Sequence, residues 1–219
     1  MVVSHAATGY DGDMDSIPDL RALALVCTLK PSPADSSSAL MATHLLDALA
    51  AHGVSGDEVR VVDHAVRFGV TTDEGDGDGW PALRDRLLEA DILVISTPIW
   101  LGQPSSVCKM VLERLDAEIA ETDDRGRMSM SDKVAVVGVV GNEDGAHHTI
   151  AECLQGLNDV GFSVAANAGA YWVGEAMGSV DYIDHDETPE FVASTIATTA
   201  SNAAHLARLL RADGYPAPE

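Results

Sequence analysis

The sequence predicts a three-layer α/β protein, in which helices cover both faces of a doubly wound parallel sheet of five strands in the order 2-1-3-4-5. Apolar runs of strand length alternate with stretches of helical periodicity, and the connections between them are short. Residues 92–95 and 134–140 show no polar alternation, which is typical of parallel strands buried on both faces. Five units are too few for a closed eight-unit barrel, so an open sheet is favoured.

The first half of the chain supplies two strands and two helices. Residues 22–27 (ALALVC) are predicted to form the first strand, and a Pro/Ser loop leads from it into a helix. The apolar face of that helix consists of Met41, Leu45, Ala48 and Leu49. Residues 59–62 form the predicted second strand, and an acidic, glycine-rich surface loop follows it. A helix over residues 81–89 begins with Pro81, which suits an early helical position.

The second half supplies three strands and three helices. The strand over residues 92–95 ends at Thr97-Pro98, and Ser105 or Ser106 caps the next helix. The remaining elements are strands over residues 134–140 and 163–170, a helix from about His148 to Val160, and a final helix that Thr188-Pro189 caps.

The chain length of 219 residues suits one domain with a substantial core. We expect a flexible N-terminal extension over residues 1–20, a single domain over 21–212 and a C-terminal tail over 213–219. No stretch has the roughly 18 uninterrupted apolar residues of a membrane helix. The N-terminus also lacks the basic and apolar regions of a secretory signal. A cytoplasmic protein without membrane insertion is therefore expected.

The charge of the chain restricts its partners. Thirty-five acidic and 13 basic residues give a formal net charge of −22. Nucleic acids and anionic membranes are themselves negatively charged, so neither is expected as a partner. An acidic surface of this kind suits a salty environment or serves plain solubility, and both explanations stay open.

No metal site is predicted. The three cysteines, Cys27, Cys108 and Cys153, lie far apart and form no C-x-x-C pair, so neither a zinc site nor a disulfide framework is indicated. Asp11, Asp13 and Asp15 imitate the start of a calcium-binding loop, but Ser16 and Ala22 stand where that loop needs glycine and glutamate.

The first candidate site lies between the first strand and the first helix. Hydroxyl side chains there can donate hydrogen bonds, and the helix N-terminus adds free N–H groups and a partial positive charge. The loop matches neither the G-x-G-x-x-G nor the G-x-x-x-x-G-K-[ST] pattern. This chemistry suits a phosphate group, although an ordinary Ser/Pro turn with a helix cap explains the same residues. The candidate ligands are Thr28, Lys30, Ser32, Ser36, Ser37 and Ser38.

Two further loops are candidates for the same site. Trp100 follows the third strand and can lie against a planar ligand, but it can equally pack over the rim of the core. Two glycines after the fourth strand let the main chain approach a ligand closely, or form only a turn. In the predicted sheet these loops converge with the first one, so one ligand can contact all three. The candidate residues are Pro98, Ile99, Trp100, Leu101, Gly102, Gly141, Asn142, Glu143, Asp144, Gly145, Ala146 and His147.

With these loops in view, residues 21–160 resemble the NADPH-dependent FMN reductase branch of the flavodoxin-like superfamily. The first-loop pattern of that family, a hydroxyl residue, a basic residue and a Ser-Asn-Thr-like run, is similar to Thr28, Lys30 and residues 36–38, with a longer insertion here. The second-loop pattern is similar to residues 98–102, followed by Ser105-Ser106 and Lys109. The resemblance implies a flavodoxin-like fold.

The resemblance also implies a cofactor and a reaction. FMN would place its phosphate on the first loop, its isoalloxazine against the second and its pyrimidine edge near residues 142–146. NADH or NADPH would deliver hydride to flavin N5, and a small acceptor such as a quinone or a flavin would collect the electrons. No side-chain acid or base is required, so no catalytic residue is assigned. His147 either reaches the flavin edge or simply starts a helix. Members of this family commonly form homodimers, and one is expected here by analogy.

Two other functions stay open. A flavodoxin-type electron carrier would bind FMN without turnover of its own, and the acidic surface suits docking onto basic partners. The chain is longer than a minimal carrier, which argues against this function. A flavin-free domain of the same fold is the third possibility. Residues 171–174 and 181–187 would form a wall over the open flavin face, a dimer contact or part of the core.

Overall fold

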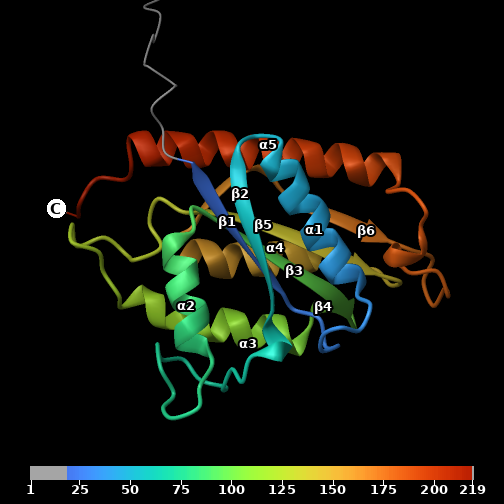
Figure 1. Ribbon diagram of the computed structural model, residues 1–219, viewed down its shortest axis with the longest axis horizontal. Coiled ribbons are helices and arrows are strands. Elements are labelled where there is room, and N and C mark those ends of the chain that lie inside the picture. Colours follow the sequence, from blue (N-terminus) through green and yellow to red (C-terminus); the bar gives the residue numbers. More distant parts are fainter. Residues whose placement is uncertain (1–18, 219) are drawn as a thin grey trace, which may run out of the picture.

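The computed structural model describes residues 19–218, so nearly all of the expected N-terminal extension, including Asp11, Asp13 and Asp15, lies outside the described residues. Strands and helices alternate along the described part (Figure 1). The strands are β1 (Leu20–Val26), β2 (Val54–Arg60), β3 (Ile92–Trp100), β4 (Gln103–Pro104), β5 (Val134–Gly141) and β6 (Ser163–Val173). The α-helices are α1 (Ser37–Ala50), α2 (Trp80–Glu89), α3 (Ser106–Leu115), α4 (Ala146–Asp159) and α5 (Glu190–Ala212). Within residues 19–218, no helix combines the length and the apolar character needed to cross a membrane.

The parallel sheet has the predicted topology. Its five long strands lie in the order β2-β1-β3-β5-β6, which corresponds to 2-1-3-4-5 when only these strands are counted. Val94 of β3 pairs with Ala24 of β1 on one side and with Val136 of β5 on the other, so β3 is central. A sixth strand, β4, pairs antiparallel with the end of β3 and is the one addition to the predicted sheet.

The end of β3 differs from the sequence prediction. The strand does not stop at Thr97-Pro98 but continues to Trp100, which pairs with Gln103 of β4. Leu101 and Gly102 form the turn between the two strands, with φ angles of 53° and 72°. Two successive residues with positive φ are the backbone of a tight hairpin turn. The expected loop is therefore a β-hairpin that projects beyond the sheet.

Other element boundaries also move. β2 covers residues 54–60 instead of 59–62, because it pairs along the whole length of β1. β6 extends past residue 170 to Val173, because its last residues pair with the end of β5. α4 begins at Ala146, two residues before the expected start, directly after the left-handed Gly145.

Of the two expected caps of α3, Ser105 is the one observed. Its hydroxyl oxygen accepts a hydrogen bond from the N–H of Cys108.

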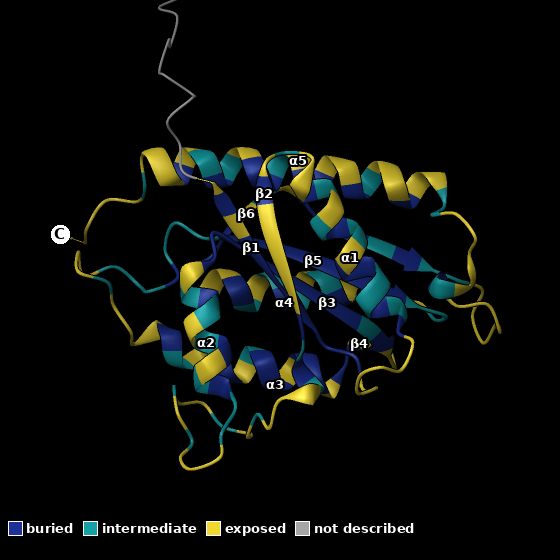
Figure 2. Cartoon of the chain, viewed as in Figure 1, coloured by how far each residue is buried: buried dark blue, intermediate teal, exposed yellow. Residues whose placement is uncertain are grey.

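Each face of the sheet has its own core. Leu23 and Leu25 of β1 pack with apolar side chains of α2, α3 and α4, whereas Ala22 and Ala24 pack with those of α1 and α5. Neighbouring residues of a strand point to opposite faces, so the same strand contributes to both cores. Figure 2 shows the central strands buried between helices whose outer faces are exposed. The three-layer arrangement is thus the predicted one.

A buried ion pair holds the acidic, glycine-rich loop between β2 and α2. The side chains of Arg114 in α3 and of Asp78 in the loop are both fully buried, with 2.8 Å between Nη2 and Oδ2. The guanidinium also donates to the backbone carbonyls of Arg67 and Thr71, both at 2.9 Å. It lies 5.7 Å from the centre of the Trp80 ring, within range of a cation–π interaction. One α3 side chain therefore organises a long loop from the inside.

Asp78 stays ionised because of its surroundings. Burial alone would raise its pKa, but backbone N–H groups of Glu74, Arg67 and Trp80 and the Arg114 guanidinium donate to the carboxylate and lower the pKa overall. A folded-state pKa below the unfolded value makes the group stabilising above about pH 4. That contribution is lost as the pH falls towards the lowered pKa.

Replacement of Arg114 by Leu should lower the free energy of unfolding by about 3–5 kcal/mol, because the Asp78 carboxylate then stays buried without its cation. Urea unfolding followed by circular dichroism at pH 7 measures the change. Arg86→Leu is the matched control, because Arg86 pairs with Asp57 on the surface at 3.5 Å and should lose no more than about 1 kcal/mol. Equal stabilities of the two variants would contradict a central role for Arg114.

Candidate functional site

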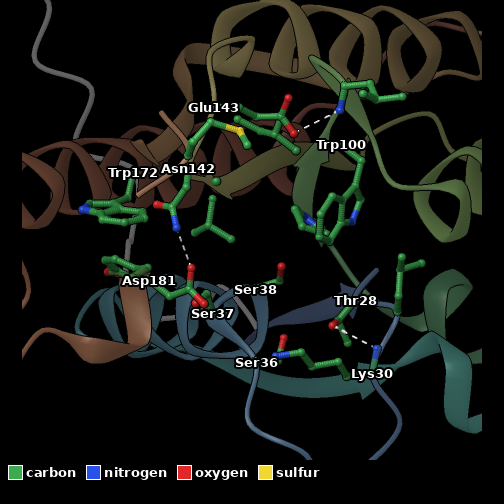
Figure 3. A pocket seen from close by; sticks show the side chains of 18 residues that line it. Thr28, Lys30, Ser36, Ser37, Ser38, Trp100, Asn142, Glu143, Trp172 and Asp181 are labelled. Atoms are coloured by element: carbon green, nitrogen blue, oxygen red, sulfur yellow. Dashed lines mark hydrogen bonds between the residues drawn. The ribbon is translucent and has the colours of Figure 1, made fainter. Parts of the chain in front are cut away.

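A cavity of about 420 Å³ opens at the carboxyl ends of β1, β3 and β5. Four segments far apart in the sequence line it, and Figure 3 shows their side chains around one central space. Three of these segments are the loops expected to converge, and the fourth follows β6. Loops at this edge of an open α/β sheet are the usual place for a ligand.

The first loop brings hydrogen-bond donors to one end of the cavity. Thr28, Lys30 and residues 36–38 line it. The Ser36 hydroxyl oxygen caps α1 by accepting a hydrogen bond from the N–H of Ala39 at 3.3 Å. The first N–H groups of a helix have no partner within it, so those of Ser37 and Ser38 stay available to a ligand. Hydroxyls, helix amides and an ammonium group together suit an anion.

The rest of this loop is anchored to β2 and to η2, a 3-10 helix over Val61–Asp63. Ser32, one of the expected ligands, lies outside the cavity lining; its N–H and hydroxyl donate to the Asp63 carboxylate, the hydroxyl at 2.5 Å. These hydrogen bonds, first that of the hydroxyl, lower the pKa of Asp63. Arg60 donates to the carbonyls of Lys30 and Ala34, at 3.3 and 2.7 Å. The sequence prediction included neither of these two anchors, Asp63 and Arg60. The possible signal was the presence of two charged residues at or just after the end of β2, the strand beside β1.

The second loop forms an apolar wall. Pro98, Ile99, Trp100 and Leu101 line the cavity, whereas Gly102 lies outside its lining. Ile99 is buried, but Trp100 is 54% exposed and Leu101 is 92% exposed. A side chain that packed over the core would be largely buried, so the Trp100 ring is free to contact a ligand.

The third loop holds the β3–β4 turn in place. The two carboxylate oxygens of Glu143 accept hydrogen bonds from the N–H groups of Leu101 and Gly102, at 3.0 and 3.2 Å. A Cβ atom on Gly145 would lie 2.7 Å from the Gly102 Cα, and Gly145 has a φ of 110°. Only glycine allows both that conformation and that approach. The loop therefore positions the Trp100 wall.

Only part of the third loop reaches the cavity. Gly141, Asn142 and Glu143 line it, whereas Asp144, Gly145, Ala146 and His147 do not. Ala146 is buried at the start of α4, and the exposed His147 packs edge-on against Tyr171, with 5.1 Å between the ring centres. In this structure His147 therefore does not line the cavity.

The fourth segment, residues 174–188, is a strap that returns from β6 across the cavity. Met177 N–H donates to the carbonyl of Asn142 at 3.0 Å, and the Asn142 amide donates to Asp181 Oδ1 at 2.7 Å. Near its far end, Ile183 N–H donates to the Ser37 hydroxyl oxygen at 3.3 Å. The strap therefore connects the third loop with the N-terminus of α1.

The strap and the end of β6 add an aromatic side to the cavity. Trp172, Met177, Asp181 and Tyr182 line it. Trp172 is nearly buried, so it belongs both to the core and to the cavity wall. Tyr182 is held by a contact of 2.8 Å between its hydroxyl and Nδ1 of His44. Sequence reasoning named Trp172 and residues 181–187 as one possible wall but missed Met177, which carries no recognisable motif.

The charges in the cavity are unevenly distributed. Lys30 is the one basic side chain in its lining within the described part of the chain, and its Nζ donates to the carbonyl of Asp35 at 3.3 Å. Glu143 and Asp181 are the acidic side chains of the lining. Any anion bound here therefore depends on local donors, because the chain as a whole carries a formal charge of −22.

Known proteins resemble this chain in sequence and in structure. A family model for NADPH-dependent FMN reductase matches residues 20–178. The 8-demethyl-8-aminoriboflavin-5'-phosphate synthase of Streptomyces davaonensis is 34% identical over 210 residues, which cover 90% of this chain and 80% of that protein.

Two solved structures illustrate the likeness of the fold. The crystal structure of RosB with bound 8-demethyl-8-formylriboflavin-5'-phosphate has a TM-score of 0.82 and 34% identity, and the match covers 90% of this chain and 82% of that one. A flavodoxin from the domain Archaea has a TM-score of 0.55 and 9% identity, with 86% of this chain and 99% of that one covered. At that identity the second match shows the fold alone, which is flavodoxin-like.

Replacement of Glu143 by Ala should free the β3–β4 turn, because the N–H groups of Leu101 and Gly102 lose their acceptors. Their hydrogen exchange, measured by NMR, should become about tenfold faster. Glu143→Gln keeps one oxygen acceptor and should give an intermediate rate. Asp144→Ala is the matched control, because this exposed neighbour lies outside the cavity lining. Unchanged exchange in the Glu143→Ala variant would show that the carboxylate does not hold the turn.

Proposed function

The chain belongs to the NADPH-dependent FMN reductase family, and we propose that it binds FMN in the cavity and transfers electrons from NAD(P)H to a small acceptor such as a quinone or a flavin. Membership of this family, together with the fold, supports a flavin-dependent oxidoreductase. By analogy with the family, the proposal extends to a cytoplasmic homodimer with a small-molecule acceptor. The observation that carries FMN binding is that phosphate-type donors and an exposed tryptophan face the same cavity.

The donor set at one end fits the phosphate of FMN. Thr28 and the serines at the start of α1 present hydroxyl groups, two helix N–H groups are free of helical partners, and Lys30 supplies a positive charge. This combination does not depend on the overall field of the protein, which is repulsive to anions. FMN binding here should therefore tolerate salt better than binding that depends on long-range attraction.

The remainder of the cavity fits a flat ring system. Figure 3 shows Trp100 and Trp172 on opposite sides of the space, with Asn142 and Glu143 between them. Pro98, Ile99 and Leu101 make the wall beside Trp100 apolar. Aromatic and apolar surfaces of this kind bind planar ligands, and a few polar groups at the edge fix their orientation.

The chemistry divides between the cofactor and the chain. Bound FMN would supply the two-electron redox chemistry. The chain contributes the orientation of the ring against Trp100, a partly enclosed apolar space and the anchoring of the phosphate end. No acid–base pair is needed for these tasks, and the proposal assigns none.

A second candidate function follows from one comparison. The Streptomyces davaonensis relative is named as a synthase of a modified riboflavin phosphate, and RosB was solved with a modified flavin phosphate bound. The same cavity would then hold flavin phosphate as a molecule to be changed, not as a permanent cofactor. Both functions need the same phosphate end and the same ring wall.

The decisive experiment starts with purification of the full chain and titration with FMN. We expect a saturable change in flavin absorbance, followed by oxidation of NADH or NADPH when a quinone is present. A protein that takes up no FMN would overturn both functions. Mass spectrometry of the flavin recovered after incubation separates them, because a reductase returns FMN unchanged and a flavin-modifying enzyme does not.

Replacement of Trp100 by Ala should raise the dissociation constant for FMN about three- to tenfold, because the ring loses its aromatic neighbour. Equilibrium titration followed by flavin fluorescence measures this change. Phe68→Ala is the matched control, because Phe68 is another exposed aromatic residue and lies outside the cavity lining. If the Trp100→Ala variant bound FMN as tightly as the wild type, the proposed position of the ring would be wrong.

A further inference from the structure

The carboxylate of Asp181 brings a negative charge to the cavity. The Asn142 side-chain amide donates a hydrogen bond to this carboxylate at 2.7 Å. The carboxylate also takes part in the capping box at the start of the 3-10 helix η4 (Tyr182–Asp184). The cap is reciprocal, because the N–H of Asp181 donates to the Asp184 carboxylate at 2.8 Å. Asp181 therefore fastens the strap to the third loop.

The strap carries this negative charge towards the proposed phosphate end. Ile183, two residues after Asp181, donates its N–H to the Ser37 hydroxyl oxygen at 3.3 Å, and η4 contacts α1. Asp181 lines the same cavity as Ser37 and Ser38 (Figure 3). An anion at the N-terminus of α1 would therefore share its surroundings with this carboxylate.

We propose that Asp181 opposes the phosphate of the flavin and so limits how tightly the site holds FMN. This inference rests on the proposed function, because it concerns the same site. Lys30 is the one basic residue among the described lining residues, so a second anion beside the phosphate is not balanced by a second cation there. Asp181 is exposed, so solvent and salt weaken the repulsion, but two like charges within one cavity still repel each other. Asp181 thus lowers the preference of the site for FMN over riboflavin, which has no phosphate.

The arrangement reflects two competing requirements. The strap needs an acceptor at position 181, both for the Asn142 amide and for the first turn of η4. A carboxylate meets that need, but it brings a negative charge to an anion site. An amide oxygen would serve as the same acceptor without the charge, since Asn is as good a helix cap as Asp. The two roles of Asp181 can therefore be separated by a single substitution.

The test is Asp181→Asn, compared with the wild type in titrations with FMN and with riboflavin. The dissociation constant for FMN should fall about three- to tenfold, because only the repulsive charge is removed. The release rate of FMN in stopped-flow experiments should fall as well. The affinity for riboflavin should stay unchanged. Asp181→Ser also keeps an oxygen that can cap η4, so the dissociation constant for FMN should fall in this variant too. It serves as the test if the Asp181→Asn variant folds poorly.

Asp184→Asn is the matched control. This substitution removes one negative charge from Asp184, the other residue of the capping box. Asp184 is exposed and lies outside the cavity lining, so FMN affinity should not change. An equal gain in both variants would mean that only the overall charge matters, and this would overturn the inference.

Two other results would also overturn it. Unchanged FMN affinity in the Asp181 variants would show that the carboxylate does not face the phosphate. Weaker binding of both flavins would show that Asp181 binds the flavin itself. If the wild type bound neither flavin, the proposed function would be overturned, and this inference with it. If the wild type bound FMN and Asp181→Asn did not change that affinity, only the inference would be overturned.

Discussion

The reversal of strand order between β1 and β3 is the constraint on which the rest of the structure depends. β1 is followed by α1 on one face of the sheet, and β3 is followed by α3 on the other. The chain therefore leaves the two neighbouring strands in opposite directions, and a space opens between their ends. The cavity occupies that space. The position of the cavity follows from the strand order alone. The side chains around the cavity then decide which ligand it can bind.

Polar interactions then shape the edges of this space, and many of them use acidic side chains. Glu143 holds the β3–β4 turn, Asp63 holds Ser32, and Asp181 holds Asn142. Away from the cavity, Asp78 holds the loop between β2 and α2 through Arg114. Each carboxylate accepts from backbone N–H groups or from side-chain donors, which is a stronger interaction than a neutral hydrogen bond. The high acidity of the chain thus serves its internal architecture as well as its surface.

The sequence predicts the strands, their order and the three-layer arrangement, because parallel strands buried on both faces are continuous apolar runs. It also places Thr28 and Trp100 at the edge of the sheet, since each follows a strand, and both reach the cavity. It does not reveal that Ser32 turns towards Asp63, because that contact joins the loop after β1 to η2, the 3-10 helix after β2. It leaves residues 181–187 open as a wall, a dimer contact or part of the core, because their position depends on how a late segment returns across the sheet. The same dependence hides Met177, since no local pattern records such a return. Tertiary hydrogen bonds account for most of the differences.

The strap has a consequence for the divergence of related proteins. The family match ends at residue 178, yet Asp181 and Tyr182, just beyond it, line the cavity. Two residues of one wall therefore lie beyond the family match, whereas Trp172, Met177 and the loops after β1, β3 and β5 lie within it. Family members can differ in this last part of the wall while they keep the rest of the cavity, so ligand preference can change by substitutions in a short late segment.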